Sequence, residues 1–464
     1  MKQAFQRLYA RLPIPAQNLA CTVAGWRRAR ARFTPEFHRA LAELERSVDD
    51  PVEVHRERQW RALRALLLRA REVVPACRDL PPPADHPDPE EALRRTLERI
   101  PPLDKATYRD RPKSFIARDI PKGQLLRGHT SGTTGTALPL WHTPRALAHE
   151  YAVVWRMYRR FGARLGDPSL RFGGQIVVPF GQRKPPFWRV SYRPRQTLFS
   201  IYHLTPENLH AYVAAIHAAP ARFVQGYPSS LHLVAQAMLD AGRPLPVRRL
   251  CAVFTSSERL LASHRETIEK AFQAPVVDRY GSSEFCVSLS GCEAQNLHVD
   301  MEFCIVEVER FAETDGWVRG PLLVTGLRND ATPFLRYRIG DVGTLSKKPC
   351  PCGRPGDVLL DVDGRLEDYV VTPDGRRIGR VDHIFKEQYD IAEAQILQDT
   401  EKAIEVLVVP RLGYGEASER SLLREIRSRL GSEIEVTIRK VDAIPREASG
   451  KFRAVKSRVG SRVS

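Results

Sequence analysis

The stretch TSGTTGT at residues 130–136, which follows the apolar pair Leu125-Leu126, is the most informative segment of the sequence. Glycine and small hydroxyl residues let backbone N–H groups and side-chain hydroxyls approach phosphate oxygens closely. The stretch is not a Walker A loop, because it lacks the Gly-Lys-Ser/Thr ending of that motif. Alone, it is equally compatible with a surface loop of small residues, so its interpretation depends on the motifs that follow it.

Four further motifs follow in the sequence: YGSSE at 280–284, YRIGDVG at 337–343, GRLED at 364–368 and PREASGKFR at 445–453. Each motif alone has an ordinary structural explanation. Asp341 suits a turn, and Tyr280 can bury its ring at the end of a strand. Glu284 and Lys451 can be solvated surface charges. Five such motifs in this order are, however, not expected by chance.

Together the five motifs resemble those of the adenylate-forming superfamily, which comprises acyl-CoA synthetases, adenylation domains and luciferases. The resemblance spans residues 130–453. The segments QGYPSS at 225–230, TSSE at 255–258 and CPCG at 350–353 are similar to those of the phenylacetate-CoA ligase branch. Within that branch, the sequence looks closest to the CapK and coenzyme F390 synthetase-like members.

The resemblance implies an α/β fold with two domains. A large N-terminal AMP-binding domain is expected over 1–363, with a helical lead-in over 1–100, and a small mobile α+β lid over 364–464. The hinge is expected at Glu367, beside Asp368, although similar enzymes commonly have Asp or Lys there. The residue pattern agrees, because short β-rich runs alternate with amphipathic helices. The runs are 175–178, 251–254, 275–277, 303–308 and 322–325, and the helices include 206–218 and 230–239.

The resemblance also implies a role for each motif in binding ATP. Glu284 helps to bind Mg²⁺, a hard cation that prefers carboxylate and phosphate oxygens. Tyr280 stacks near adenine, and Asp341 accepts hydrogen bonds from the ribose hydroxyls, with Arg365 nearby. Lys451 bridges the substrate carboxylate and the α-phosphate in the transition state. The other ATP-binding residues belong to the first loop and two turns: Thr130, Ser131, Gly132, Thr133, Thr134, Gly135, Thr136, Ser257, Glu258, Gly281, Ser282 and Ser283.

The activity that follows is the ATP-dependent activation of a carboxylic acid. The carboxylate attacks the α-phosphorus of ATP and displaces pyrophosphate, so positioning and charge neutralisation carry the catalysis. The acyl-adenylate is then expected to react with CoA and give an acyl-CoA. Transfer to an amine, a hydroxyl or a carrier protein is the first alternative. A catalytically silent nucleotide-binding protein is the second, and the missing Walker lysine disfavours a P-loop phosphotransferase.

The acid itself is not specified by the sequence. Several aromatic side chains are candidates for the acyl pocket and would suit an aryl or arylacetic acid. Packing in the apolar core explains each of them equally well. The candidates are Phe180, Phe187, Trp188, Tyr202, Tyr227 and Phe285.

Four residues have the composition and spacing of a structural zinc site. Cys292 and His298 form one pair of candidate ligands, and Cys350 and Cys352 form another about 50 residues later. Two such pairs can complete a tetrahedral Zn²⁺ site. Cys286 or Cys304 can replace one ligand, and free thiols beside a buried histidine are the alternative. The remaining three cysteines lie apart, so the pattern is not a disulfide framework.

Length and charge limit the remaining classes of function. A chain of 464 residues has room for two to four domains, and its net charge is 72 − 55 = +17. The excess of basic residues is spread along the chain and not concentrated at its C-terminal end, where residues 365–464 carry 19 basic and 17 acidic side chains. We therefore expect no specific nucleic-acid partner. No apolar run reaches about 18 residues and no secretion signal is recognised, so no membrane span and a cytoplasmic location are expected.

Overall fold

The computed structural model describes residues 8–129, 138–205, 207–258, 260, 262–310, 312–363, 370–378, 384–385, 388, 390–410, 413–442, 444 and 455–459. A 13-stranded sheet forms the large domain, in the order β11-β13-β14-β15-β10-β9-β8-β7-β6-β3-β5-β4, with β12 beside β13. One half is parallel: β5 (Gln196–Ser200), β3 (Ser169–Gly173), β6 (Phe223–Gly226), β7 (Ala252–Ser256) and β8 (Val276–Gly281). This half has the character of an α/β sheet, which is covered on both faces.

The rest of the sheet is antiparallel. Its strands are β4 (Trp188–Ser191) at one edge and β9 (Ser288–Gly291), β10 (Leu297–Val299), β11 (Cys304–Val308), β12 (Ala312–Glu313), β13 (Trp317–Gly326), β14 (Tyr337–Ser346) and β15 (Val358–Asp363) at the other side. The change of direction occurs at β8, which pairs in parallel with β7 and antiparallel with β9.

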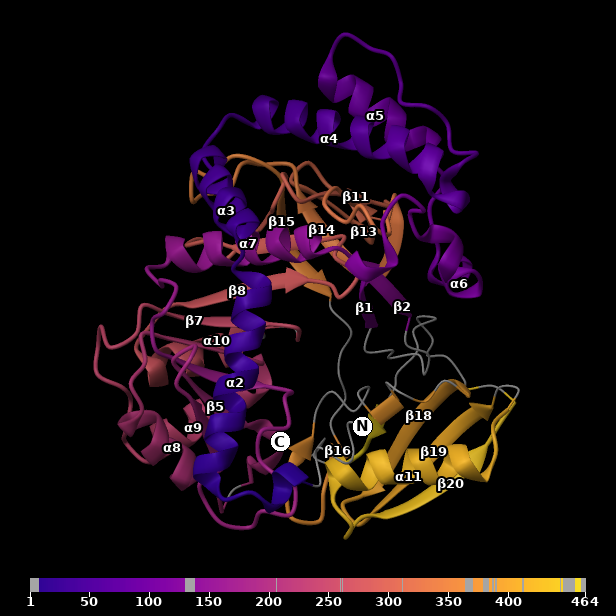
Figure 1. Ribbon diagram of the computed structural model, residues 1–464. Helices are drawn as coiled ribbons and strands as arrows, with labels where there is room; N and C mark the ends of the chain where they lie inside the picture. Colours follow the sequence, from indigo (N-terminus) through magenta and orange to yellow (C-terminus); the bar gives the residue numbers. More distant parts are fainter. Residues whose placement is uncertain are drawn as a thin grey trace.

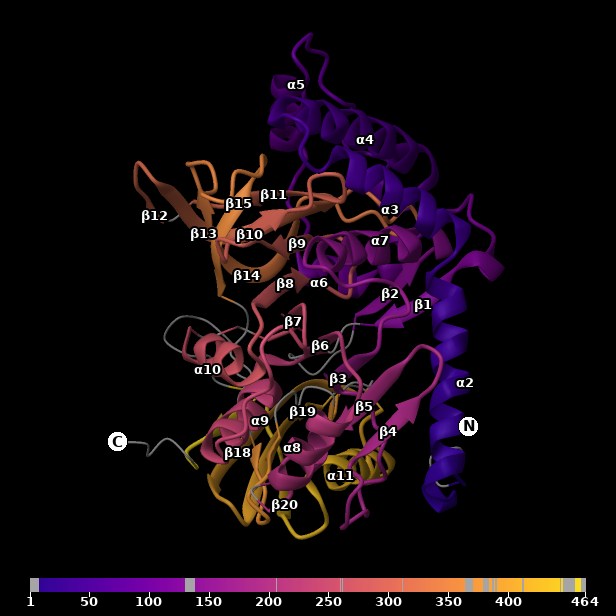
Figure 2. The same ribbon diagram turned by 90° about the vertical axis from the view of Figure 1, so that its left-hand side faces the viewer.

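Helices cover both faces of the parallel half. Three of them, α8 (Leu209–Ala218), α9 (Pro228–Asp240) and α10 (Ala262–Phe272), share one apolar core with Leu170, Val224 and Val253 of the strands. On the opposite face lie α7 (Pro144–Arg160) and α2 (Ile14–Arg32), and Met157 of α7 packs there with Phe254. Val253 and Phe254 point to opposite faces because side chains alternate along a strand. Figure 2 shows α2 running alongside β4 and β5.

The N-terminal helices α3 (Pro35–Ser47), α4 (Val52–Val73), α5 (Pro89–Arg99) and α6 (Lys105–Asp110) lie over the antiparallel half (Figure 1). A buried ionic network joins them to the sheet. Arg156 of α7 donates to Glu302 and to Asp300, each at 2.8 Å. Ser47 of α3 also donates to Glu302, at 2.9 Å. The Arg156 and Glu302 side chains are 7% exposed and that of Asp300 is fully buried, so water cannot replace these bonds.

The C-terminal residues form a smaller α+β unit with its own apolar core. Its four-stranded sheet has the order β20-β19-β18-β21, and α11 packs on it through Leu422 and Ile426. Arg376 of this unit donates to the carbonyl oxygen of Tyr202 in the large domain, at 3.0 Å. The elements are β16 (Val370–Val371), β17 (Arg377–Ile378), β18 (Ile391–Thr400), β19 (Ala403–Pro410), α11 (Glu416–Leu430), β20 (Glu435–Lys440) and β21 (Val455–Ser457).

The predicted α/β architecture is confirmed, but one predicted strand is wrong. Residues 175–178 form no strand, although Val177 and Val178 are buried. They pack against Cys21 of α2 and Leu198, and the carbonyl of Val177 accepts from the Tyr9 hydroxyl at 2.6 Å. Residues 175–178 are therefore apolar because they are buried under a helix, and they do not pair with a strand. No helix among the described residues combines the length and apolarity that a membrane crossing needs. The boundary at 363–364 stays a prediction, because residues 364–369 lie outside the described ranges.

We expect Arg156→Ala to lower the free energy of unfolding of the large domain by about 3–5 kcal/mol, because it leaves two buried carboxylates uncompensated. Urea titration followed by tryptophan fluorescence measures this change. Arg159→Ala is the matched control, since the ion pair of Arg159 with Glu45 lies at the surface, with the Arg159 side chain 47% exposed. That variant should cost about 0.2–1 kcal/mol. Equal effects of the two variants would contradict the structural role of the buried network.

Candidate functional site

The candidate site lies where the parallel strands end. β7 ends at Ser256 and β8 at Gly281, and the predicted residues Ser257 and Ser282 follow directly. Ligands of α/β proteins bind at this carboxyl edge of the sheet, because the connecting loops and free backbone groups gather there. Ser257 has a positive φ of 73°, so the chain turns sharply after β7. Its hydroxyl lies 3.4 Å from that of Ser256.

Tyr280 and Asp341, which are 61 positions apart in the sequence, meet in the structure. The Tyr280 hydroxyl on β8 donates to the Asp341 carboxylate on β14 at 2.6 Å. Burial and the neighbouring Asp341 carboxylate raise the pKa of Tyr280 well above its ordinary value, so the phenol keeps its proton. The bond uses one acceptor position of Asp341, and a carboxylate has more than one. The remaining acceptor positions of the Asp341 carboxylate suit two adjacent hydroxyl groups of a ligand.

Gly281 is needed at the end of β8 because of a crowded arginine. A Cβ atom at this position would lie 2.9 Å from the guanidinium nitrogens of Arg279. That guanidinium cannot simply move away, since it pairs with the buried carboxylate of Glu150 on α7. The glycine of the YGSSE motif therefore lets a buried ion pair form directly below the site.

Glu284 is a buried carboxylate at this edge of the sheet. Its side chain is 6% exposed, and it accepts a hydrogen bond from the Tyr337 hydroxyl at 3.3 Å. Among the residues that the structure describes, the Tyr337 hydroxyl is the hydrogen-bond donor to Glu284, and a neutral donor does not neutralise a buried carboxylate. A hard divalent cation such as Mg²⁺ fits this donor, particularly with phosphate oxygens completing its coordination.

Glu258 has a structural partner near the site. Its carboxylate accepts from the backbone N–H of Ser229 at 3.1 Å, in the first turn of α9. A carboxylate at a helix N-terminus is stabilised by the free N–H groups and the helix dipole. The bond connects the TSSE segment to the QGYPSS segment, so two of the motifs that carried the family resemblance are in contact.

The hairpin β1 (Leu126–His129) and β2 (Pro139–His142) encloses the predicted phosphate loop. His142 stacks on Phe285 with ring centroids 4.4 Å apart, which connects the hairpin to the YGSSE motif. Figure 1 shows the hairpin directed toward the C-terminal unit. The loop itself, residues 130–136, lies outside the described residues, as do Arg365, Glu367, Asp368 and Lys451. Their roles stay predictions.

A cavity of about 400 Å³ extends from this edge of the sheet along the face covered by α2 and α7. Of the six aromatic residues considered for an acyl pocket, Phe285 alone lines it. Phe187, for example, is fully buried in the core with α8 and α9. The sequence analysis did not identify the residues that do line the cavity. They include Arg28, Arg32, Glu150, Tyr151, Arg171 and Arg279.

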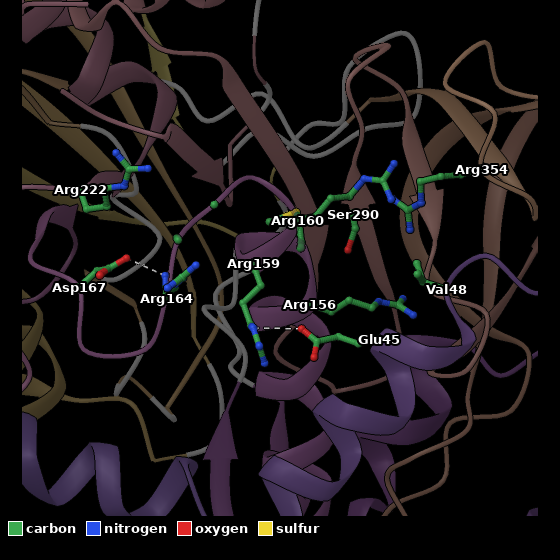
Figure 3. A pocket seen from close by; sticks show the side chains of 13 residues that line it. Glu45, Val48, Arg156, Arg159, Arg160, Arg164, Asp167, Arg222, Ser290 and Arg354 are labelled. Carbon is green, nitrogen blue, oxygen red and sulfur yellow. Dashed lines mark hydrogen bonds and ion pairs between the residues drawn. The ribbon is translucent and has the colours of Figure 1, made fainter. Parts of the chain in front are cut away.

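A second cavity, of about 760 Å³, lies at the opposite edge of the sheet (Figure 3). It is lined by Arg222, which directly precedes β6, and by Asp167, which precedes β3. It is rich in arginine, but much of that charge is already paired. Arg159 pairs with Glu45 at 3.1 Å and Arg160 with Glu293 at 2.9 Å. Met157 and Asp167 line both cavities, but the residues of the candidate site, such as Ser257 and Gly281, line only the first of the two.

The four predicted zinc ligands converge. The Cys292 and Cys350 sulfur atoms are 3.7 Å apart, and the Cys352 sulfur is 3.2 Å from Nε2 of His298. One ligand atom of each residue lies within 4.8 Å of the others, as a tetrahedral site with S and N ligands requires. Cys286 and Cys304, the alternative ligands, are buried in the main apolar core instead. The donor set fits Zn²⁺, whose presence stays a prediction.

Comparison with known proteins relates the chain to CapK. Residues 370–458 match the model of the CapK C-terminal domain. The chain is 24% identical over 457 residues to Protein CapK of Staphylococcus aureus, which covers 96% of this chain and 98% of that protein. It is 32% identical over 168 residues to indoleacetate–lysine synthetase of Pseudomonas savastanoi, covering 36% and 38% of the two chains.

Solved structures give the same result for the fold. The 2-hydroxyisobutyryl-CoA ligase with 2-HIB-AMP and CoA in the thioesterification state superposes with a TM-score of 0.56 and 19% identity, over 89% of this chain and 91% of that chain. The same ligase in the postadenylation state gives a TM-score of 0.53, with the same identity and coverage. The predicted resemblance to the adenylate-forming superfamily and its CapK-like members is confirmed, and so is the fold class.

We expect about one Zn²⁺ per chain in protein purified without added metal, because a closed S₃N site binds zinc tightly. Elemental analysis by plasma mass spectrometry measures the content. Cys350→Ser should remove the metal and lower the thermal midpoint, while Cys77→Ser, at a buried thiol outside the group, should keep it. A content below about 0.2 Zn²⁺ per chain would contradict the assignment.

Proposed function

We propose that the protein is an AMP-forming ligase that activates a carboxylic acid as an acyl-adenylate. The single observation that carries the proposal is the meeting of Tyr280, Asp341 and the buried Glu284 at the carboxyl edge of one sheet. The fold shared with 2-hydroxyisobutyryl-CoA ligase and the near full-length match to CapK support it. In this assignment Asp341 accepts from the ribose hydroxyls, and the protonated Tyr280 holds its carboxylate in place.

The chemistry requires neutralisation of charge more than a covalent nucleophile. A carboxyl oxygen attacks the α-phosphorus, the bond to the β-phosphate breaks, and pyrophosphate leaves. Glu284 would hold Mg²⁺, which supplies positive charge to the phosphates. We assign the β- and γ-phosphates to loop 130–136, with Arg365 near the ribose. Lys451 would approach the substrate carboxylate and the α-phosphate.

The second step is proposed as transfer to CoA, with formation of an amide as the second candidate. The name of the Pseudomonas relative describes a synthetase that joins indoleacetate to lysine, which favours an amine acceptor. In either case, one site serves both steps if the small domain rotates about the predicted hinge at Glu367 and Asp368. Arg376, which bonds to the Tyr202 carbonyl, would have to break that contact during rotation. We place the reaction in the cytoplasm.

We expect Lys451→Ala to abolish adenylate formation while thioester or amide formation from preformed acyl-adenylate survives. The reason is that the lysine charge offsets the negative charge only during attack on the phosphate. Pyrophosphate release measures the first step, and product formation from synthetic acyl-adenylate measures the second. Lys456→Ala, on β21, is the control. Equal loss of both steps in Lys451→Ala would oppose this assignment.

Asp341→Ala should reduce kcat/KM for ATP by about 10- to 100-fold, since it removes charged hydrogen bonds worth about 1.5–3 kcal/mol. Tyr280→Phe should reduce it less, because Asp341 keeps its charge and loses only one donor. Steady-state pyrophosphate release with varied ATP gives both values. An Asp341→Ala enzyme with unchanged kcat/KM for ATP would rule out the ribose contact.

A screen of acceptors separates the two candidates for the second step. With an acid that supports pyrophosphate release, the products should be AMP, pyrophosphate and an acyl-CoA when CoA is present. Mass spectrometry of reactions with CoA, lysine or other amines identifies the acylated product. Formation of ADP and phosphate would contradict adenylation altogether.

A further inference from the structure

We propose that the acid activated by this protein carries a second anionic group, a carboxylate or a phosphate, which binds to Arg28, Arg32 and Arg171 in the cavity beside Ser256. This inference rests on the proposed function, because it assumes that the cavity receives the acid. It adds a site for a distal oxyanion that the sequence motifs do not indicate.

The three arginines face the same space from two elements. Arg28 and Arg32 are four positions apart on α2, so they lie on one face of that helix. Arg171 is the middle residue of β3, between Leu170 and Phe172. Those two side chains belong to the core on the face covered by α8 and α9. Because side chains alternate along a strand, Arg171 points to the opposite face, toward α2 and the cavity.

The cavity has more positive than negative charge. It is lined by four arginines, Arg28, Arg32, Arg171 and Arg279, and by two acidic residues, Glu150 and Asp167. Glu150 pairs with Arg279, and Asp167 accepts from the backbone N–H of Arg164 at 2.7 Å. Within the described residues, neither Arg28 nor Arg171 has a carboxylate within ion-pair distance. The guanidinium of Arg32 lies over the face of the Tyr151 ring, 4.3 Å from its centroid.

The same arginines are partly withdrawn from water and repel one another. Burial lowers the pKa of Arg28, and the Arg171 guanidinium lowers it further. The pKa of Arg32 is lowered by burial first, and Arg171 and Arg28 also lower it. Like charges in a partly buried position are unfavourable without a counter-ion. An oxyanion relieves this cost, and the planar guanidinium matches two oxygens of a carboxylate or phosphate at once.

The cavity also suits an acid with two separated anionic ends. One end of the cavity is lined by Ser256, Ser257 and Gly281, where the adenylate is proposed to form. It continues from there along α2 and α7 to the loop at Gly166. A volume of about 400 Å³ lies in the range of small-molecule sites. Tyr151 and Phe285 line it too, so an acid with a ring between its two anionic groups fits.

The test compares acids that differ only in the distal group. Pyrophosphate release is measured with alkanoic and arylacetic acids, with the dicarboxylic acids of matching length, and with the ω-phosphorylated analogues. We expect kcat/KM for at least one dianionic series to exceed that of the matching monoanionic acid by about 100-fold. The reason is that the distal group can form bidentate hydrogen bonds with the arginines, which a monoanionic acid cannot. The series that is preferred identifies the distal group as a carboxylate or a phosphate.

Variants then locate the preference. Arg171→Gln should lower kcat/KM for the preferred dianionic acid by about 30-fold or more and change that of the monoanionic acid less than threefold. Arg28→Gln should act in the same direction, and Arg28→Lys should recover part of the loss. Arg222→Gln is the control, because Arg222 is an exposed arginine that lines the other cavity. Thermal midpoints of all variants show whether each one is folded.

The outcomes separate this inference from the proposed function. Preference for monoanionic acids, or equal losses for both classes in Arg171→Gln, overturns the distal site and leaves adenylation intact. If no acid yields pyrophosphate, the proposed activity is wrong. Calorimetric titration of the wild-type protein with the same acids then tests whether the arginines bind a distal anionic group. Binding of dianionic acids that Arg171→Gln abolishes supports the site, and absence of such binding overturns it.

Discussion

Strand β8 imposes the constraint on which the candidate site depends. It is the last strand of the parallel half, and its other edge pairs antiparallel with β9 over Arg279, Tyr280 and Gly281. Parallel strands bring their carboxyl ends to one edge, whereas antiparallel strands return through short connections. Asp341 lies on the antiparallel strand β14, which is separated from β8 by β15, β10 and β9 in the sheet order. The hydrogen bond from Tyr280 joins that strand to the loop edge of the parallel strands.

The sequence indicated which motif residues lie together better than it indicated the walls of the cavity beside them. Motif residues such as Tyr280 and Asp341 were proposed because five motifs, in order, resemble those of adenylate-forming enzymes, and the structure brings these two residues together. The four candidate zinc ligands were identified from the spacing of their two pairs, and they converge in the structure. The α/β architecture followed from strands that alternate with helices. Each of these signals is local in the sequence or carried by a short motif.

The cavity walls could not be predicted because they depend on long-range packing. Arg28 and Arg32 come from a helix that precedes the first motif by about 100 residues, and the periodicity of that helix does not say which strand it covers. The aromatic residues around 180–202 were candidates for the pocket, with packing in the apolar core as the alternative, and Phe187 belongs to that core. The error at 175–178 has the same origin, since an apolar run that packs under α2 resembles a strand in the sequence.

The positive charges of the chain can be interpreted only when the acidic partner of each arginine is known. Arg156 and Arg279 are neutralised by buried carboxylates and hold the layers together. Many surface arginines pair with acidic neighbours along their own helices, as Arg94 does with Glu91, and contribute little. Arg28 and Arg171 differ from both groups because they are partly buried and have no carboxylate at ion-pair distance in the described part of the chain. Since Arg279 is already committed to Glu150, the unbalanced charge lies on the α2 side of the cavity and not beneath Tyr280. A ligand that is anionic at both ends would then be oriented before the reaction, with its distal group on the arginines and its other carboxylate at the edge of the sheet where phosphate chemistry is proposed to occur.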